Sequence, residues 1–149
     1  MKLRQVYNEL IRIYLKEGNS GVIDMDIDDG KYDWITDGIS IWAIPKENPF
    51  NFNYLKAEWF ETMADEGLVV TKITRSPNIE SKDIIKLEAE KEDVSLYLNE
   101  KRLKWFDKGY GLRISKVPLG RFGLMCQVYE DGELRGLILG LNVAESRQF

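Results

Sequence analysis

Residues 32–45 read YDWITDGISIWAIP, and this stretch decides the fold class. Apolar and aromatic residues of the kind found on both sides of the Thr-Asp-Gly at 36–38 favour β-strands. Glycine tolerates the positive φ that tight hairpin turns require, so the pattern predicts a strand, a turn and a return strand. The preceding residues alternate in the same way up to another turn signal, Asp-Gly at 29–30. Residues 21–45 are therefore expected to form a three-stranded antiparallel meander.

The rest of the chain shows further strand patterns and a few helical ones. Apolar residues three and four apart predict amphipathic helices, and alternating ones predict strands. The expected elements are a helix at 3–17, a second helix at 53–66, strands within 68–98, a short helix at 100–107 and strands within 110–143. The predicted fold class is α+β, a mostly antiparallel sheet with about three helices, in a single domain spanning residues 1–149. Gly136 and Gly140 fall within a strand pattern, which indicates backbone crowding or a bulge.

The composition excludes several classes of site. The 149 residues are 44% hydrophobic and 31% charged, with no histidine and one cysteine, Cys126. Without histidine, Ser-His-Asp and Cys-His catalysis and the usual zinc sites cannot be built. We therefore expect no catalytic residues, no metal and no cofactor, and a buried Cys126 thiol. No apolar run approaches the length of a membrane span and the N-terminal residues lack a signal-peptide core, so a cytoplasmic protein is expected.

One apparent metal motif fails on inspection. Asp24, Asp26 and Asp28 have the spacing of the first ligands of an EF-hand calcium loop. That loop needs glycine at its sixth position and a bidentate glutamate at its twelfth, where this chain has Asp29 and Ile35. The three aspartates are instead expected on the solvent-facing side of a strand.

The net charge of −4 is unevenly distributed. Residues 1–70 hold 7 Lys/Arg against 13 Asp/Glu, whereas residues 95–121 hold 7 against 2. Basic residues interleaved with aromatics suit phosphate contacts combined with base stacking. The candidate nucleic-acid-binding residues are Lys101, Arg102, Lys104, Lys108, Arg113, Lys116 and Arg121. The alternative is a solvated surface whose aromatic residues point into the core.

Aromatic residues near the third strand suggest a second kind of site. Trp42 lies in a strand that is apolar on both faces, and Phe50 and Phe52 follow in a loop. Exposed aromatics dominate protein–protein hot spots, so these three residues are candidates for a partner-binding anchor. Burial under the expected helix at 53–66 is the equally weighted alternative.

Three segments carry a resemblance to a known family. WITDGISIWAIP at 34–45, LNEKRLKWF at 98–106 and VYEDGELRGLILGLNV at 128–143 resemble, in order, parts of bacterial DNA polymerase β sliding clamps. Single-domain clamp-like proteins of phages and prophages look more similar still. The resemblance covers about a third of the chain, which is long enough for one domain where a bacterial clamp subunit has three. It implies a clamp-like domain without catalysis that either encircles DNA as a homo-oligomer or binds another protein.

Two functions are expected from these observations. The first is a non-enzymatic, clamp-like module of phage or prophage type, associated with DNA or replication. The alternative is a small phage-type inhibitor or adaptor that binds a host protein with a defence or regulatory role. Both place the chain in the cytoplasm of a bacterial host cell, with a protein partner, DNA as a further possible partner and no membrane. An enzyme that uses carboxylates and a divalent metal is a third hypothesis.

Overall fold

The computed structural model describes the chain except for residues 26–29, 55–64, 76–82, 119–122 and 142–149. The elements run in the order α1 (Leu3–Glu17), η1 (Gly18–Ser20), β1 (Ile23–Asp24), β2 (Tyr32–Thr36), β3 (Ser40–Pro45), β4 (Asn53–Tyr54), β5 (Leu68–Val69), β6 (Lys72–Thr74), β7 (Ile84–Ala89), η2 (Lys91–Asp93), β8 (Val94–Asn99), η3 (Glu100–Leu103), β9 (Gly111–Ile114), β10 (Met125–Glu130) and β11 (Glu133–Leu139).

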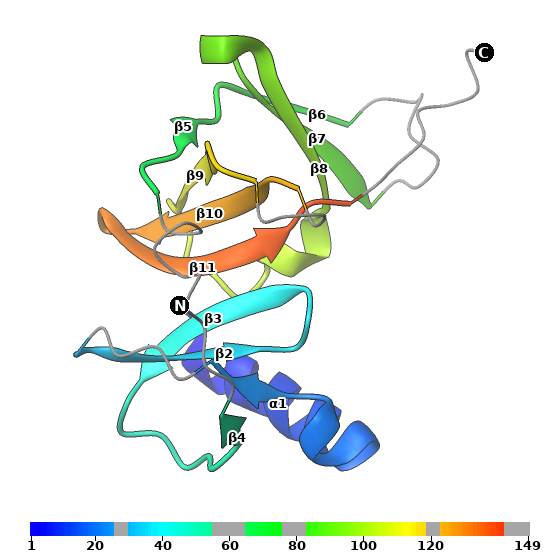
Figure 1. Ribbon diagram of the computed structural model, residues 1–149, viewed down its shortest axis with the longest axis vertical. Helices are drawn as coiled ribbons and strands as arrows, with labels where there is room; N and C mark the ends of the chain where they lie inside the picture. The colour runs from blue at the N-terminus through cyan, green and yellow to red at the C-terminus, as the bar shows by residue number, and fades with distance from the viewer. Residues whose placement is uncertain (26–29, 55–64, 76–82, 119–122, 142–149) are drawn as a thin grey trace.

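The strands form a large and a small sheet. The large sheet has eight strands in the order β4-β1-β2-β3-β11-β10-β9-β5, and the small one has three in the order β6-β7-β8. All pairings are antiparallel except β1 with β4. Figure 1 shows α1 beside β2 and β4 at one end of the large sheet, and the small sheet at the other end.

Side chains on both faces of β3 are buried, one of the two outcomes that its apolar pattern allowed. Trp42 and Ile44 belong to a core cluster that includes α1 residues and the inner side chains of β7 and β8. Ile41 and Ala43, which alternate with them, belong to a second cluster on the opposite face. Strand residues alternate between faces, so one short strand supplies both clusters.

The predicted hairpins are confirmed. Strands β2 and β3 pair in register, with Trp34 opposite Ala43 and Thr36 opposite Ile41. Strands β10 and β11 pair around a turn in which Asp131 and Gly132 both have positive φ, 52° and 76°. Positive φ at both central residues is what a two-residue hairpin turn of type I′ requires.

The expected number of helices is wrong. Within the described part of the chain there is one α-helix, α1, because the short helix predicted at 100–107 is a single 3₁₀ turn, η3. The amides of Lys104 and Phe106 donate hydrogen bonds to the carbonyls three residues earlier. This 3₁₀ spacing is tighter than that of an α-helix, and it places Trp105 and Phe106 in the core. The helix predicted at 53–66 begins with two residues of strand, β4, and its residues 55–64 lie outside the described ones.

The expected solvent-facing aspartates are also corrected in part. Asp24 on β1 is buried, with 6% of its surface exposed. Asp26 and Asp28 lie outside the described residues. Gly136 is crowded as expected, since a Cβ there would overlap the ring of Phe106.

Candidate functional site

A hollow of the described surface arises where the chain changes sheets. Val69 pairs with Arg113 in the large sheet, and the Val70 amide donates to the Leu112 carbonyl at 3.0 Å. The next amide, that of Thr71, donates to Glu88 of the small sheet at 2.8 Å. Strands β6 and β9 therefore diverge, and a groove of about 870 Å³ opens between them. We call it the β6–β9 groove.

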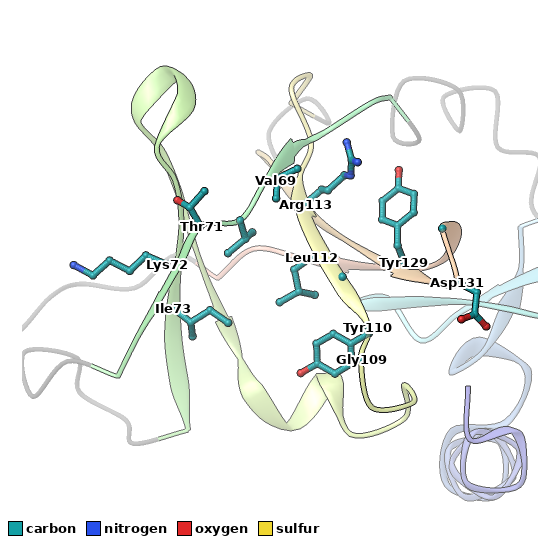
Figure 2. Close-up of a pocket in the computed structure, with 13 residues that line it drawn as sticks. Val69, Thr71, Lys72, Ile73, Gly109, Tyr110, Leu112, Arg113, Tyr129 and Asp131 are labelled. Carbon is teal, nitrogen blue, oxygen red and sulfur yellow. The ribbon is translucent and has the colours of Figure 1, made fainter.

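The walls of the β6–β9 groove are mainly apolar. Ile73 on β6 and Leu112 on β9 lie on its two sides, and Val69 lies at its closed end (Figure 2). Val69 and Ile73 are 56% and 44% exposed, among the larger values for apolar residues of the described chain. The groove can thus receive an apolar side chain from outside.

Two cations and one carboxylate line the same groove. Arg113 donates to the Gly67 carbonyl at 3.2 Å, and its guanidinium lies 5.3 Å from the centre of the Tyr129 ring. The ammonium of Lys72 lies 4.0 Å from Glu88. Asp131 projects from the β10–β11 turn (Figure 2). Burial raises the pKa of Tyr129, so its phenol is neutral at physiological pH.

A second, smaller hollow is basic. It holds about 310 Å³ and is lined by Lys2, Glu100, Leu103, Lys104, Phe106, Lys108 and Tyr110. We call it the lysine hollow. The Glu100 carboxylate accepts hydrogen bonds from Arg75, so it is already engaged. Lys2 was missed by sequence reasoning because it lies a hundred residues from the basic segment, and no local signal marks it.

The seven predicted nucleic-acid-binding residues do not form one surface. Lys104 and Lys108 line the lysine hollow, and Arg113 lines the β6–β9 groove. Lys101 is paired with Asp83 at 3.4 Å, and Arg102 with Asp37 at 2.6 Å. Lys116 is exposed and lines neither hollow, and Arg121 lies outside the described residues.

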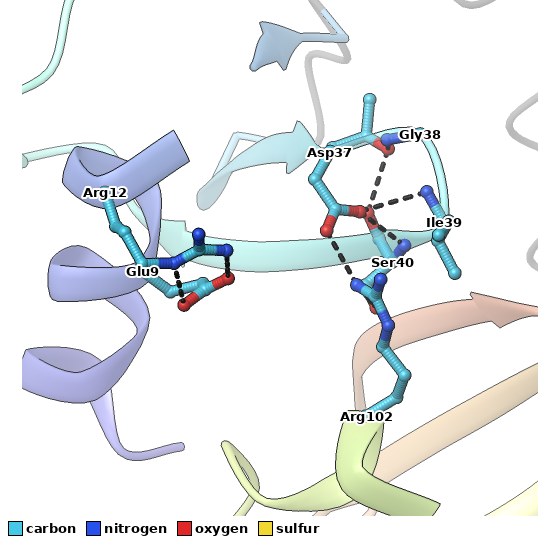
Figure 3. Close-up of polar contacts among 8 residues, drawn as sticks. Glu9, Arg12, Asp37, Gly38, Ile39, Ser40 and Arg102 are labelled. Carbon is cyan, nitrogen blue, oxygen red and sulfur yellow. Dashed lines mark hydrogen bonds and ion pairs between the residues drawn. The ribbon is translucent and has the colours of Figure 1, made fainter. Parts of the chain in front are cut away.

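The Thr-Asp-Gly turn explains the placement of Arg102 (Figure 3). Asp37 Oδ1 accepts the amides of Ile39 at 3.0 Å and Ser40 at 2.8 Å, and Oδ2 accepts the Arg102 guanidinium. Gly38 completes the turn with a φ of 95°. Asp37 therefore stabilises the β2–β3 turn and also links this hairpin to η3. The Thr-Asp-Gly motif, on which the resemblance to sliding clamps partly rests, thus has a structural role in this chain.

A separate ion pair lies near this turn on α1. The Arg12 guanidinium donates to both carboxylate oxygens of Glu9, at 2.6 and 3.1 Å (Figure 3). The hydrogen bonds from Arg12 hold the pKa of Glu9 below its ordinary value. Because Arg12 is exposed, we assign this pair no functional role.

Of the predicted aromatic anchor, two residues belong to the core. Trp42 has no exposed surface and packs edge-on against Trp105, with ring centres 5.3 Å apart. Phe52 is also buried, and half-buried Phe50 stacks on it at 5.0 Å. In this structure Phe50 alone is accessible to a partner, beside a small pocket of about 220 Å³ next to Leu15.

The described residues contain neither a candidate metal site nor a membrane-spanning helix. No group of three or more Cys, Asp or Glu side chains is placed to hold a metal ion. No helix combines the length and the apolar character needed to cross a membrane.

Comparison of the chain with protein-family models, with curated proteins and with solved structures finds no match. The resemblance to sliding clamps therefore stays a prediction from the sequence.

Proposed function

We propose that the chain is a non-enzymatic binding module that holds a segment of a partner protein in the β6–β9 groove. The observation that carries this proposal is the partial exposure of Val69 and Ile73 on the walls of one concave surface. Single exposed apolar residues are ordinary, but an apolar surface gathered in a groove is typical of a binding site. The bound partner segment would cover the apolar side chains that the two diverging sheets leave partly exposed.

The proposal favours the adaptor or inhibitor hypothesis over the DNA-associated one. A nucleic acid needs free aromatic faces for base stacking as well as cations for its phosphates. Trp105 and Phe106 of the basic segment are buried, and Arg113 lies over the Tyr129 ring. Aliphatic walls are better suited to a protein side chain. In the proposed role the module acts in the cytoplasm of a bacterial host, on a host protein.

Capture experiments with matched variants test this function. Ile73→Asp places a carboxylate on the wall of the groove, and Ile73→Ser removes an apolar wall. Leu15→Ser is the control, because Leu15 is 78% exposed on α1 and lines no part of the groove. We expect proteins captured from host lysate by the wild type and by Leu15→Ser, quantified by mass spectrometry, to be lost with both groove variants. Equal capture by folded groove variants would refute the proposal.

The clamp-like, DNA-associated role is the second candidate, and the lysine hollow is the observation that favours it. Lys2, Lys104 and Lys108 surround Tyr110, a combination that can hold a phosphate next to a ring. Phosphate contacts make affinity fall with salt, with a slope of about −3 in log K against log salt for three lysines and about −6 for seven. Titration of labelled duplex DNA at several salt concentrations measures this slope. No DNA binding at low salt, together with a monomer in sedimentation, would remove this candidate.

A further inference from the structure

The β6–β9 groove and the lysine hollow are neighbours that share one residue. Tyr110 lines both of them. It lies immediately before β9, and Lys108 and Gly109 lead into it from the side of the lysine hollow. Gly109 has a φ of 88°, so the chain turns sharply at this point. A segment that leaves the open end of the groove past Tyr110 therefore reaches the lysine hollow.

The two hollows differ in chemistry. The groove presents aliphatic walls with Lys72 and Arg113 at its rim. The lysine hollow presents three ammonium groups, while its one carboxylate, Glu100, is bound to Arg75. An occupant that fits both must be apolar at one end and negatively charged at the other.

From this juxtaposition we infer that the module recognises an acidic peptide segment with an apolar anchor. The anchor side chain occupies the β6–β9 groove between Ile73 and Leu112. Asp or Glu side chains that follow it in the peptide lie on the ammonium groups of the lysine hollow. The inference rests on the proposed function and adds the chemistry of the partner to it. Charge complementarity of this kind sets specificity and the rate of association more than raw affinity.

Selection from a random peptide library displayed on phage tests the inference without knowledge of the partner. The full chain is the bait, in four forms: wild type, Ile73→Asp, Lys104→Glu/Lys108→Glu and Lys16→Glu. Lys16→Glu is the control for a charge reversal elsewhere on the surface, because Lys16 is exposed in the last turn of α1 and lines neither hollow. Thermal melts first establish that each variant is folded. Synthetic copies of enriched peptides are then titrated by fluorescence anisotropy, with oligothymidylate as a nucleic-acid probe.

We expect the wild type and Lys16→Glu to enrich peptides that combine an aliphatic or aromatic residue with nearby Asp or Glu. Ile73→Asp should abolish their enrichment, because it places a charge where the apolar anchor packs. With Lys104→Glu/Lys108→Glu the apolar preference should persist, the acidic preference should vanish, and affinity for the wild-type peptides should fall about tenfold, as two exposed charge contacts predict.

The failures of the two proposals are distinguishable. Peptides that need the apolar groove but carry no excess of Asp or Glu would overturn the inference and leave the proposed function standing. Peptides that bind Ile73→Asp as well as the wild type, or no enriched peptides, would overturn both. Oligothymidylate binding that is lost with Lys104→Glu/Lys108→Glu, without acidic peptides, would assign the lysine hollow to a nucleic acid and overturn the inference.

Discussion

Substitutions at Asp37 separate its two roles in the Thr-Asp-Gly turn. Its carboxylate accepts two turn amides through Oδ1 and the Arg102 guanidinium through Oδ2. Asp37→Asn keeps an oxygen for the turn amides and removes the charge that Arg102 contacts. Asp37→Ala removes both sets of bonds. Comparing the two variants therefore measures the turn contribution apart from the ion pair.

The expected costs follow from burial. The Asp37 side chain is 8% exposed and that of Arg102 is 23% exposed, so the pair is screened less than a surface pair. We expect Asp37→Asn to lower the free energy of unfolding by about 1 kcal/mol, and Asp37→Ala by about 3 kcal/mol, because each lost turn hydrogen bond adds about 1 kcal/mol. For a domain of this size, 1 kcal/mol corresponds to a Tm shift of about 2–4 °C.

Urea unfolding followed by tryptophan fluorescence suits this measurement, because Trp42 and Trp105 are buried against each other. Glu9→Gln is the control, since it removes an ion pair with an exposed Arg12 and should cost about 0.3 kcal/mol. A cycle of Asp37→Asn with Arg102→Gln should give a coupling energy of about 1 kcal/mol. Equal destabilisation by Asp37→Asn and Asp37→Ala would refute the assigned turn role.

Further predictions concern Gly136, Gly111 and Cys126. Gly136→Ala should lower the free energy of unfolding in urea melts by about 1–3 kcal/mol, because its Cβ would overlap the buried Phe106 ring. Gly111→Ala should change it by no more than about 0.5 kcal/mol. A larger loss for Gly111→Ala than for Gly136→Ala would contradict the packing. Burial raises the pKa of the Cys126 thiol from 9.0 to about 12, so Ellman's reagent should react with it only after unfolding. Since the unfolded thiol ionises first, this group's contribution to stability should be lost as pH rises between 9.0 and about 12, and a pH-independent urea midpoint in that window would contradict it.

Local signals were enough to predict the hairpins. The β2–β3 and β10–β11 turns each contain Asp-Gly between apolar runs, and their geometry depends on the turn residues themselves. The short segment at 100–107 shows where such signals fail. Its apolar residues have helical spacing, which predicts an α-helix. The segment must connect β8 to β9 within a few residues and also bury Trp105 and Phe106, and a 3₁₀ turn meets both requirements.

The binding surface could not be predicted from local patterns. Val69 and Ile73 look like ordinary strand residues in the sequence, and the groove exists because hydrogen bonding passes from one sheet to the other at Val70 and Thr71. The sequence also did not show which aromatic residues are exposed. Trp42 has apolar neighbours in the sequence, which fits either a buried strand or a surface patch. Its packing against Trp105 within the core is what buries it, and that contact joins residues far apart in the sequence.

Folding also redistributes the charge that the sequence concentrates in one segment. Arg102 is neutralised by Asp37, sixty-five residues earlier, and Lys101 by Asp83. Lys2, from the acidic half of the chain, joins Lys104 in the lysine hollow. A count along the sequence therefore overstates the charge available from the basic segment and misses the lysine that the fold adds to it. What remains accessible is a small cationic hollow beside an apolar groove, and this adjacency supports a short acidic segment over a long phosphate backbone as the occupant.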